Sequence, residues 1–407
     1  MSNFTRRDFV GAVAAAAGVS MATAAAEEKT ELTRRVGRPP VGPTNETLEA
    51  ENLDSKLPPD SDGGSVETFK YPFALAHKRL HEGGWSREVT VRELSIAKDL
   101  AGVNMRLTAG GIRELHWHKA AEWAIMLYGK ARITGIDYEG KAFVSDIEAG
   151  DLWYFPEGIP HSIQGLEPDG AEFLLVFDDG TFSEFGTVLL SDWMAHTPRD
   201  ILAKNFGVKP EALANLPKKE LFIFQARVPG SLEDDRRAAA GKLGLSTTAF
   251  DFRTTTMKPT KVTKGGEVRV VDSRVFPVSK TIAAAIVTVH PGGLRELHWH
   301  PNADEWMFFI QGSARMTVFA SASRARTMDF QAGDVGYVQK TLPHYVENTG
   351  DTDLKFIEMF KSSYFQDLSL NEWLTHEPPD LVAAHLNLDR AIIDAIPQEN
   401  HANLPAG

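Results

Sequence analysis

The sequence predicts an all-β protein built from two tandem copies of one domain, each an antiparallel sandwich or barrel. Three observations support this prediction. The nine-residue segment Gly110–His118 recurs with one change at Gly292–His300. Short segments of strand-like composition, separated by turn signals, accompany the repeat. The chain of 407 residues is long enough for two domains with full cores. A domain-sized period indicates a tandem duplication and not a solenoid.

Each copy carries a His-x-His pair, then a glutamate, then a third histidine. On a strand, residues two apart point to the same face, so each pair presents two imidazoles side by side. The step from glutamate to last histidine is 39 residues in both copies, 161 − 122 and 344 − 305. Three imidazoles and a carboxylate, repeated in order, indicate two metal sites. The candidate ligands are His116, His118, Glu122 and His161, then His298, His300, Glu305 and His344.

The repeat extends well beyond these candidate ligands. The offset between the copies is 182 at the histidine pair and 183 from the glutamate onward, because one residue is inserted between His300 and Glu305. Gly129 then matches Gly312. Six of the eight tryptophans also fall into matched pairs, which are Trp117/Trp299, Trp123/Trp306 and Trp193/Trp373.

The N-terminal segment predicts export. Thr5–Val10 contains a twin-arginine pattern, and an alanine-rich run ends at Ala24–Ala26, so residues 1–26 are expected to be a cleaved signal peptide. The apolar run is too short for a transmembrane anchor. We therefore expect a periplasmic or secreted protein with no membrane attachment after cleavage. Residues 27–65 are polar and proline-rich, which is typical of an extended leader.

Composition excludes several classes of function. The formal net charge of −12 disfavours nucleic-acid binding, and an anionic substrate would need local cations. The absence of cysteine excludes disulfides and thiolate metal sites.

The expected elements divide the chain into an N-terminal domain at 66–235 and a C-terminal domain at 236–407. Predicted strands of the first domain include Ala124–Tyr128, Ala131–Ile136, Leu152–Phe155 and Phe173–Phe177. A charged helix, Ser231–Lys242, separates the two domains. Both domains finish with helical signals, which begin at Ser191 and Asn371 and end in a run over Leu381–Ala395.

The spacing of the repeated ligands, followed by Pro-x-Gly-x-Pro-His in the first copy, resembles the paired motifs of the cupins. Two copies in one chain resemble a bicupin, and residues 66–395 are similar to the bacterial oxalate decarboxylases. The segment Asp178–Glu184 is the most specific sign. The resemblance implies two tandem double-stranded β-helix (jelly-roll) barrels with short helical appendages. It also implies conversion of oxalate to formate and carbon dioxide, in a homotrimer or homohexamer.

The donor set is informative about the metal. Three imidazoles and one carboxylate leave two open positions on an octahedral ion, which suits Mn(II) or Fe(II) better than structural zinc. The residues alone do not distinguish these two metals. The resemblance implies manganese, two ions per chain, with dioxygen as a catalytic co-substrate.

Arg113 and Arg295 lie three residues before the first histidine of each pair. This odd spacing would put them on the opposite face of a regular strand, so a bend or bulge after the preceding glycine pair is needed to bring them into the pocket. The resemblance implies that each arginine lies beside the metal and binds substrate. The alternative is a surface ion pair with Glu114 or Glu296.

The first copy has a longer segment before its C-terminal helices: Trp193 follows Phe177 by 16 residues, whereas Trp373 follows Phe360 by 13. The resemblance implies that this segment is a mobile lid over the first metal, and that its Glu184 is the proton shuttle. Here Phe185-Gly186 replaces the more usual Asn-Ser of the family. The alternative for Glu184 is an ordinary solvated loop carboxylate.

The second copy has a different carboxylate. Glu358 lies within the apolar segment Phe356–Phe360, where the first copy has Leu175. A charge in such a segment is paired or functional. The resemblance places a glutamate here near the second metal, which makes Glu358 a further candidate catalytic residue. The tyrosine that often accompanies it is Phe365 here, so we expect the second site to be mainly structural or auxiliary.

The sequence therefore predicts a manganese-dependent oxalate decarboxylase that acts at the N-terminal site. An oxalate oxidase would use the same metal site without the lid acid. A bicupin dioxygenase for an aromatic diol or keto compound would favour a larger apolar pocket. A non-enzymatic storage bicupin would typically have lost its metal ligands.

Overall fold

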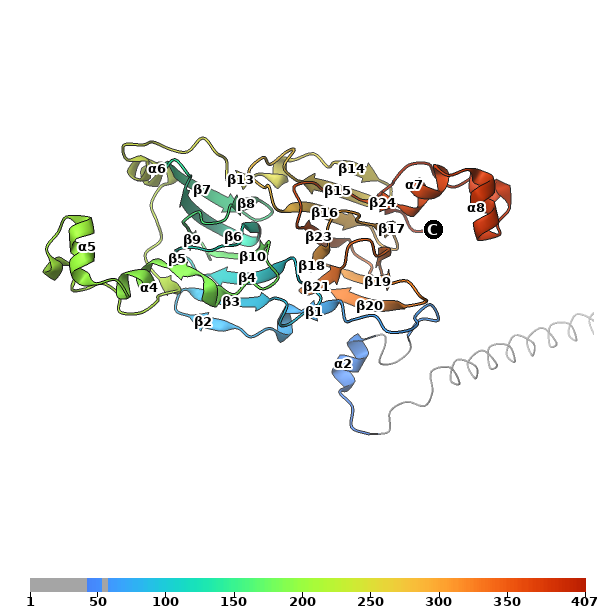
Figure 1. Cartoon of the computed structure of the whole chain (residues 1–407), viewed down its shortest axis with the longest axis horizontal. Helices are drawn as coiled ribbons and strands as arrows, with labels where there is room; N and C mark the ends of the chain where they lie inside the picture. The colour runs from blue at the N-terminus through green and yellow to red at the C-terminus, as the bar shows by residue number, and fades with distance from the viewer. Residues whose placement is uncertain (1–41, 53–57) are drawn as a thin grey trace, which may run out of the picture.

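The computed structural model describes residues 42–52 and 58–407. The predicted signal peptide at 1–26 lies outside these residues. Two β-sandwich lobes lie side by side along the long axis of the molecule (Figure 1). No helix in the described ranges has the length and apolar character that a membrane crossing requires. The predicted all-β class is confirmed.

The N-terminal lobe consists of two packed antiparallel layers. One layer has the order β8-β6-β10-β4-β3-β2, and the other joins β7, β6, β9, β5 and the short strands β11 and β12. The strands are β2 (Arg79–His81), β3 (Gly84–Val89), β4 (Ala101–Leu107), β5 (Gly111–Trp117), β6 (Glu122–Ile136), β7 (Ala142–Glu148), β8 (Leu152–Phe155), β9 (His161–Gly165), β10 (Ala171–Phe177), β11 (Val188–Leu189) and β12 (Ile223–Gln225).

The C-terminal lobe repeats this plan. Its layers have the orders β21-β18-β23-β16-β15-β14 and β20-β19-β22-β17-β24, and β25 also pairs with β17. The strands are β14 (Lys261–Thr263), β15 (Gly266–Val271), β16 (Ala283–Val289), β17 (Leu294–Trp299), β18 (Glu305–Gln311), β19 (Ser313–Phe319), β20 (Ala325–Gln331), β21 (Asp334–Val338), β22 (His344–Asn348), β23 (Leu354–Phe360), β24 (Leu368–Ser369) and β25 (Asn403–Leu404).

A glycine at the same place in each lobe carries the chain from one layer to the other. Strand β6 spans both layers of its lobe and bends at Gly129, where φ is +73°. The matching Gly312, with φ of +86°, separates β18 from β19. A Cβ on Gly129 would lie 2.0 Å from the carbonyl oxygen of Gly170. Glycine is therefore needed at this corner both for its φ and for the close approach of another backbone.

The two lobes exchange short strands. Strand β1 (Lys70–Pro72), which precedes the N-terminal lobe, pairs with β21 of the C-terminal lobe. Reciprocally, β13 (Asp251–Phe252) pairs with β8 of the N-terminal lobe. Before β1, Gly63 forms a bridge with Ala325. Each lobe thus lends an edge strand to its neighbour, and the domain limits predicted at 66–235 and 236–407 stay a prediction.

The hydrophobic core is continuous across the boundary between the lobes. One cluster fills the N-terminal sandwich, and a second fills the C-terminal sandwich and extends to Phe69, Phe73 and Trp123. Trp306 is fully buried, and its ring packs against Gly102 of β4. The contact is so close that a Cβ on Gly102 would lie 2.4 Å from the ring. Buried apolar side chains of both lobes therefore pack together in one cluster across the boundary.

Short helices precede, connect and follow the strands of the two lobes. They are α2 (Glu46–Glu51), α4 (Leu190–Ala195), α5 (Arg199–Phe206), α6 (Leu232–Ala240), α7 (Leu370–Thr375), α8 (Pro379–Leu386) and α9 (Arg390–Asp394), with single 3-10 turns η1 (Phe73–Leu75), η2 (Glu184–Gly186), η3 (Pro210–Leu213) and η4 (Thr254–Thr256). Helix α6 begins after Ser231, whose hydroxyl accepts a hydrogen bond from the amide of Asp234. The predicted single run over Leu381–Ala395 is wrong, because Asn387 adopts a left-handed φ of +53° and ends α8.

Candidate metal centres and active site

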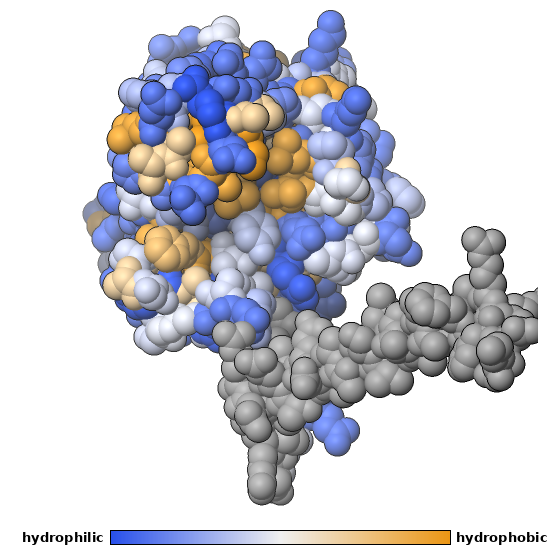
Figure 2. Space-filling view, turned by 90° about the vertical axis from the view of Figure 1, so that its right-hand side faces the viewer, coloured by the Kyte–Doolittle hydropathy of each residue, from blue (hydrophilic) through white to orange (hydrophobic). Residues whose placement is uncertain are grey.

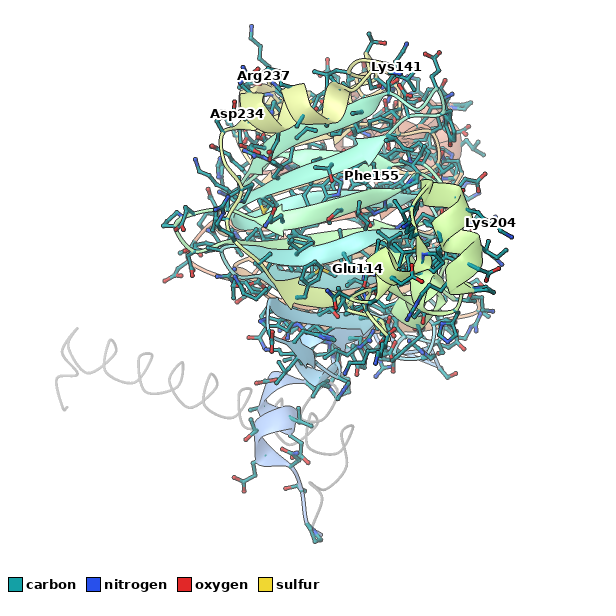
Figure 3. The ribbon with its side chains drawn as sticks, turned by 90° about the vertical axis from the view of Figure 1, so that its left-hand side faces the viewer. Glu114, Lys141, Phe155, Lys204, Asp234 and Arg237 are labelled. Carbon is teal, nitrogen blue, oxygen red and sulfur yellow. The ribbon has the colours of Figure 1, made fainter. Side chains whose placement is uncertain are left out.

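Four predicted ligands meet inside the N-terminal sandwich. His116 comes from β5, His118 directly follows it, Glu122 begins β6 and His161 begins β9. Their ligand atoms all lie within 4.8 Å of one another, and all four side chains are buried. The ring of Phe155, which Figure 3 labels within the N-terminal lobe, stacks on His161 at 4.3 Å between centroids. The repeat therefore places one compact donor set among apolar rings.

Backbone carbonyls fix how the three imidazoles present their nitrogens. His116 Nδ1 lies 2.6 Å from the carbonyl oxygen of Glu114, and His118 Nδ1 lies 2.6 Å from that of Ala120. His161 Nδ1 lies 2.8 Å from the carbonyl oxygen of Ile159. A carbonyl only accepts, so each Nδ1 carries the proton and each Nε2 keeps a free lone pair. This is the tautomer that a metal ligand requires.

Glu122 is oriented by a tryptophan. The indole Nε1 of Trp153 donates a 2.9 Å hydrogen bond to Glu122 Oε1. The second oxygen, Oε2, lies 3.3 Å from His118 Nε2 and 3.4 Å from His161 Nε2. One carboxylate oxygen is thus held by the protein while the other faces the imidazole nitrogens.

The C-terminal lobe brings together the second set of four, from β17, β18 and β22. The ligand atoms of His298, His300, Glu305 and His344 again lie within 4.8 Å of one another. His298 Nδ1 is 2.6 Å from the carbonyl oxygen of Glu296, and His344 Nδ1 is 3.0 Å from that of Leu342. His300 instead uses the carbonyl of Gln366, at 2.8 Å. The duplicated motif gives the same tautomer in both lobes.

Both donor sets fit a divalent cation. In the second set, the Nε2 atoms of all three histidines and both oxygens of Glu305 are buried and, in the described part of the chain, have no partner with hydrogen-bond geometry. They face one another instead, with His344 Nε2 at 2.8 Å from Glu305 Oε2. In the first set, His161 Nε2 is likewise buried without a hydrogen-bond partner among the described residues. Buried polar atoms are rarely left unsatisfied, and their convergence points to a bound ion. Three nitrogens and one carboxylate oxygen match Mn(II) or Fe(II) ligation.

Burial also keeps the leading imidazole of each set neutral. Desolvation, together with the positive charge of Arg113, lowers the pKa of His116 well below its ordinary value. The same two causes, burial and Arg295, lower the pKa of His298. Neutral imidazoles are the form that binds a metal.

A bulge brings Arg113 into the N-terminal site. The register between β5 and β9 shifts between Arg113 and His116, so Arg113 and His116 are both buried despite their odd spacing. The same shift occurs between Arg295 and His298. The predicted bulge is present, although it follows the arginine instead of the glycine pair.

The guanidinium of Arg113 has no carboxylate partner among the described residues. It is 3% exposed, lies 4.1 Å from the ring centroid of Phe222, and donates one long hydrogen bond of 3.4 Å to the carbonyl of Phe222. Burial lowers the pKa of Arg113, against the opposing charges of Glu184 and Glu122. An arginine remains charged even so. A buried cation with unused donors in a fork is suited to an incoming carboxylate.

The alternative of an ion pair between Arg113 and Glu114 does not occur. Glu114 accepts hydrogen bonds from the amides of Ser191, Leu221 and Phe222, at 2.8, 3.0 and 2.7 Å. Figure 3 shows Glu114 on the side of the lobe where the helical segment packs. The carboxylate therefore anchors the segment that carries Phe222, and leaves Arg113 free.

Arg295, by contrast, is already neutralised. Its Nε lies 3.2 Å from Glu358 and its Nη2 lies 2.7 Å from Asp367. Burial alone would lower the pKa of Arg295, but the two carboxylates outweigh it and raise the pKa. Burial also raises the pKa of Glu358, which is fully buried. The guanidinium of the second lobe thus has its donors occupied.

Glu184 lies in the one-turn helix η2 and is buried. It is 4% exposed, and Ser86 Oγ donates a 2.7 Å hydrogen bond to its Oε2. The amide of Glu184 donates to Glu88 Oε2 at 3.2 Å. Burial raises the pKa of Glu184, opposed by the charge of Arg113 and by Ser86. An ordinary solvated loop glutamate would show neither the burial nor the raised pKa.

Aromatic rings hold the start of the same loop against the metal ligands. Phe182 stacks on Phe177 with centroids 3.6 Å apart and nearly parallel rings. His118 lies 5.0 Å from Phe177 and 5.9 Å from Phe182. The loop therefore covers the ligands with apolar surface, which excludes water from the site.

Sequence reasoning missed four side chains that hold these groups in place: Trp153, Ser86, Phe222 and Asp367. Only Trp153 carries a signal in the sequence, because it is one of two tryptophans without a matched partner. Gly336 occupies the corresponding position in the second lobe.

Comparison with known proteins places the chain in a family. The cupin profile matches twice, over residues 75–213 and 253–394. Oxalate decarboxylase OxdC of Bacillus subtilis (strain 168) is 54% identical over 359 residues, 88% of this chain and 92% of the relative. A probable oxalate decarboxylase of Arthroderma benhamiae is 40% identical over 363 residues, 88% of each chain.

The fold agrees with these matches. A structure of Bacillus subtilis oxalate decarboxylase, from work on its Mn(II) centers, superposes with a TM-score of 0.88 at 52% identity. The superposition covers 91% of this chain and 97% of that one. With two cupin lobes and a complete three-histidine, one-glutamate set in each, the chain belongs to the cupin family and, within it, to the bicupin oxalate decarboxylases.

Proposed function

We propose that the protein is an oxalate decarboxylase that converts oxalate to formate and carbon dioxide in its N-terminal lobe. The observation that carries the proposal is the unpaired, buried guanidinium of Arg113 beside a complete metal-ligand set and a buried acid. The relatives that match most of the chain carry the name oxalate decarboxylase. The donor set suits Mn(II) or Fe(II), and the Mn(II) centers of the Bacillus subtilis enzyme favour manganese.

Arg113 binds and orients the substrate. Its unused donors pair with one carboxylate of oxalate, and the apolar rings of Phe177 and Phe182 exclude water around it. Manganese at the four ligands supplies the one-electron chemistry that weakens the carbon–carbon bond, with dioxygen as catalytic co-substrate.

Glu184 moves the proton. The monoanion of oxalate gives its proton to the Glu184 carboxylate, and the carbon–carbon bond breaks to release carbon dioxide. Glu184 then returns the proton to the remaining carbon, which completes formate. The sum, hydrogen oxalate to formate plus carbon dioxide, balances in atoms and charge. The raised pKa of the buried carboxyl suits a group that must both accept and donate a proton.

The test is turnover of oxalate by protein loaded with manganese. Formate and carbon dioxide should appear in a 1:1 ratio, and metal-free protein should be inactive. Peroxide as the main product would instead favour an oxalate oxidase. The buried Glu184 disfavours that rival, and the complete ligand sets disfavour a storage protein. The buried charge of Arg113 disfavours a dioxygenase for aromatic diols.

Metal analysis gives a second prediction. Because each lobe holds a complete and buried donor set, protein expressed with manganese should contain close to two manganese ions per chain. Elemental analysis by plasma mass spectrometry measures this directly. Content near zero, or zinc in both sites under these conditions, would contradict the assignment.

The pH dependence follows from Glu184. Burial raises its pKa above the ordinary value of 4.5, and the return step needs the protonated acid. The proton that Glu184 returns comes either from its own protonated carboxyl or from the oxalate monoanion. Both proton sources are lost as the pH rises, so formate production should decline with rising pH. Rates of formate release measured from acid to neutral pH test this. A rate that increases steadily toward neutral pH would argue against the role of Glu184.

We assign an auxiliary role to the C-terminal metal site. Glu358 and Asp367 already occupy Arg295, so an oxalate carboxylate would have to displace one of them. The catalytic role of Glu358 and the substrate-binding role of Arg295 stay predictions.

We also propose a homo-oligomer, trimer or hexamer. Figure 2 shows hydrophobic residues gathered on the end of the C-terminal lobe, where α7 and α8 lie. Matched side chains at both ends are exposed: Leu115 and Leu297 at 50% and 46%, and Trp193 and Trp373 at 53% and 54%. Such patches favour association. Light scattering should give a mass of three or six chains, and a monomer at micromolar concentration would refute this.

Export by the twin-arginine route to the periplasm or the medium stays a proposal from the Thr5–Val10 pattern.

A further inference from the structure

The loop that carries Glu184 has an unusual contact on its outer side. Phe185 is 73% exposed, yet the guanidinium carbon of Arg79 on β2 lies 4.3 Å from its ring centroid. The same carbon lies 3.9 Å from the ring centroid of Phe222. Arg79 thus contacts one ring from the loop and one ring from the core. Cation–π contacts at these distances are favourable, and arginine forms them more often than lysine.

Few other contacts hold Arg79. Its Nη1 is buried without a hydrogen-bond partner in the described residues, and Nη2 lies 3.8 Å from Glu220. The arginine side chain is 17% exposed, whereas that of Glu220 is 51% exposed, so this long ion pair is screened by solvent. The two rings are therefore the main partners of the guanidinium.

Phe222 connects this contact to the active site. The guanidinium carbon of Arg113 lies 4.1 Å from the centroid of the same ring. The amide of Phe222 is fixed by Glu114, and the side chain is 1% exposed. The core ring is therefore a rigid base, and the loop residue Phe185 is the part that can leave.

We propose that Arg79 is a positioning residue that clamps the Glu184 loop closed through Phe185. The inference rests on the proposed function, because closure matters only where Glu184 carries the proton. In the closed loop Glu184 is buried against Ser86, next to the charge of Arg113. When Phe185 leaves Arg79, the loop can open for substrate entry and product release. Phe185, which stands where the family more usually has asparagine, thus adds a contact that holds the loop closed.

Hydrogen exchange of the manganese-loaded protein tests the clamp without reference to turnover. In Arg79→Ala, amides in residues 181–187 should exchange roughly threefold to tenfold faster, which is the effect expected when one cation–π contact is lost. Phe185→Leu keeps an apolar side chain without the ring, and its amides in residues 181–187 should exchange as fast as those of Arg79→Ala. Because Phe185 is mostly exposed, this variant should fold normally even if Arg79→Ala does not. Phe185→Tyr should restore protection.

Lys78→Ala is the matched control. Lys78 Nζ also lies 4.3 Å from an aromatic centroid, that of Trp85, on the adjacent part of the same hairpin. It does not contact the Glu184 loop, so its loss should leave exchange of residues 181–187 unchanged. Equal exchange in Arg79→Ala, Phe185→Leu and the parent protein would overturn the clamp.

Product analysis separates the clamp from the function on which it rests. Arg79→Ala should keep its manganese and its KM for oxalate, while kcat for formate falls and the peroxide-to-formate ratio rises. Arg79→Lys should recover part of the kcat for formate and part of the parent protein's product ratio. Faster exchange with an unchanged product ratio would leave the clamp standing and count against Glu184 as the proton donor.

Discussion

Replacing Glu122 with alanine should abolish oxalate turnover. Glu122 is the only carboxylate among the four N-terminal ligands, and Trp153 holds it so that Oε2 faces two imidazole nitrogens. Without it, three neutral histidines remain to hold a divalent cation. Manganese content should fall from about two ions per chain to about one. Elemental analysis and formate release, measured on one preparation, test both statements.

Glu305→Ala is the matched control, because the repeat makes it the same substitution in the other lobe. It should lower the midpoint of thermal unfolding and remove the second ion. The folded protein should keep formate production, since Arg295 is occupied by Glu358 and Asp367. If folded Glu305→Ala is inactive while Glu122→Ala turns over oxalate, the roles of the lobes are reversed.

Replacing Glu184 with glutamine should change the product as well as the rate. Glutamine keeps the size and polarity of the side chain but cannot accept and return a proton. Formate production should therefore fall by roughly 10²–10⁴-fold, the usual contribution of general acid catalysis. The intermediate that lacks its proton should be oxidised instead, so peroxide should rise relative to formate.

Manganese content and a control variant make this experiment specific to the proton shuttle. Manganese content should be unchanged in Glu184→Gln, because Glu184 is not among the ligands. Glu139→Gln is the same substitution in an exposed turn that does not contact the Glu184 loop. It is a matched control and should behave as the parent protein. Unchanged formate output from Glu184→Gln would remove it as the shuttle and make Glu358 the leading candidate.

The ligand sets could be predicted from sequence because their geometry is local. Two histidines two residues apart on a strand share a face, and the duplication supplies an internal check. The fold class followed from the same repeat. The one-residue bulge after Arg113 could be expected, but its place could not, because it is set by pairing with β9.

The contacts that decide what each site does come from distant segments. Ser86 and Glu184 are 98 residues apart, and Arg295 and Asp367 are 72 apart. No local pattern indicates which partner a buried charge will meet. For the same reason, the sequence predicted the same substrate-binding role for both arginines, whereas the structure gives Arg295 two carboxylates and Arg113 none among the described residues. The strand exchange of β1 and β13 is also a non-local pairing.

The most direct test of the central claim is to quantify formate and peroxide together while manganese-loaded protein consumes oxalate. In the proposed mechanism, Arg113 holds the substrate and Glu184 returns the proton before the intermediate is oxidised. This mechanism predicts nearly one formate per oxalate with only trace peroxide, and a shift toward peroxide in Glu184→Gln. Peroxide as the main product of the parent protein, or no consumption of oxalate by protein holding two manganese ions, would contradict it.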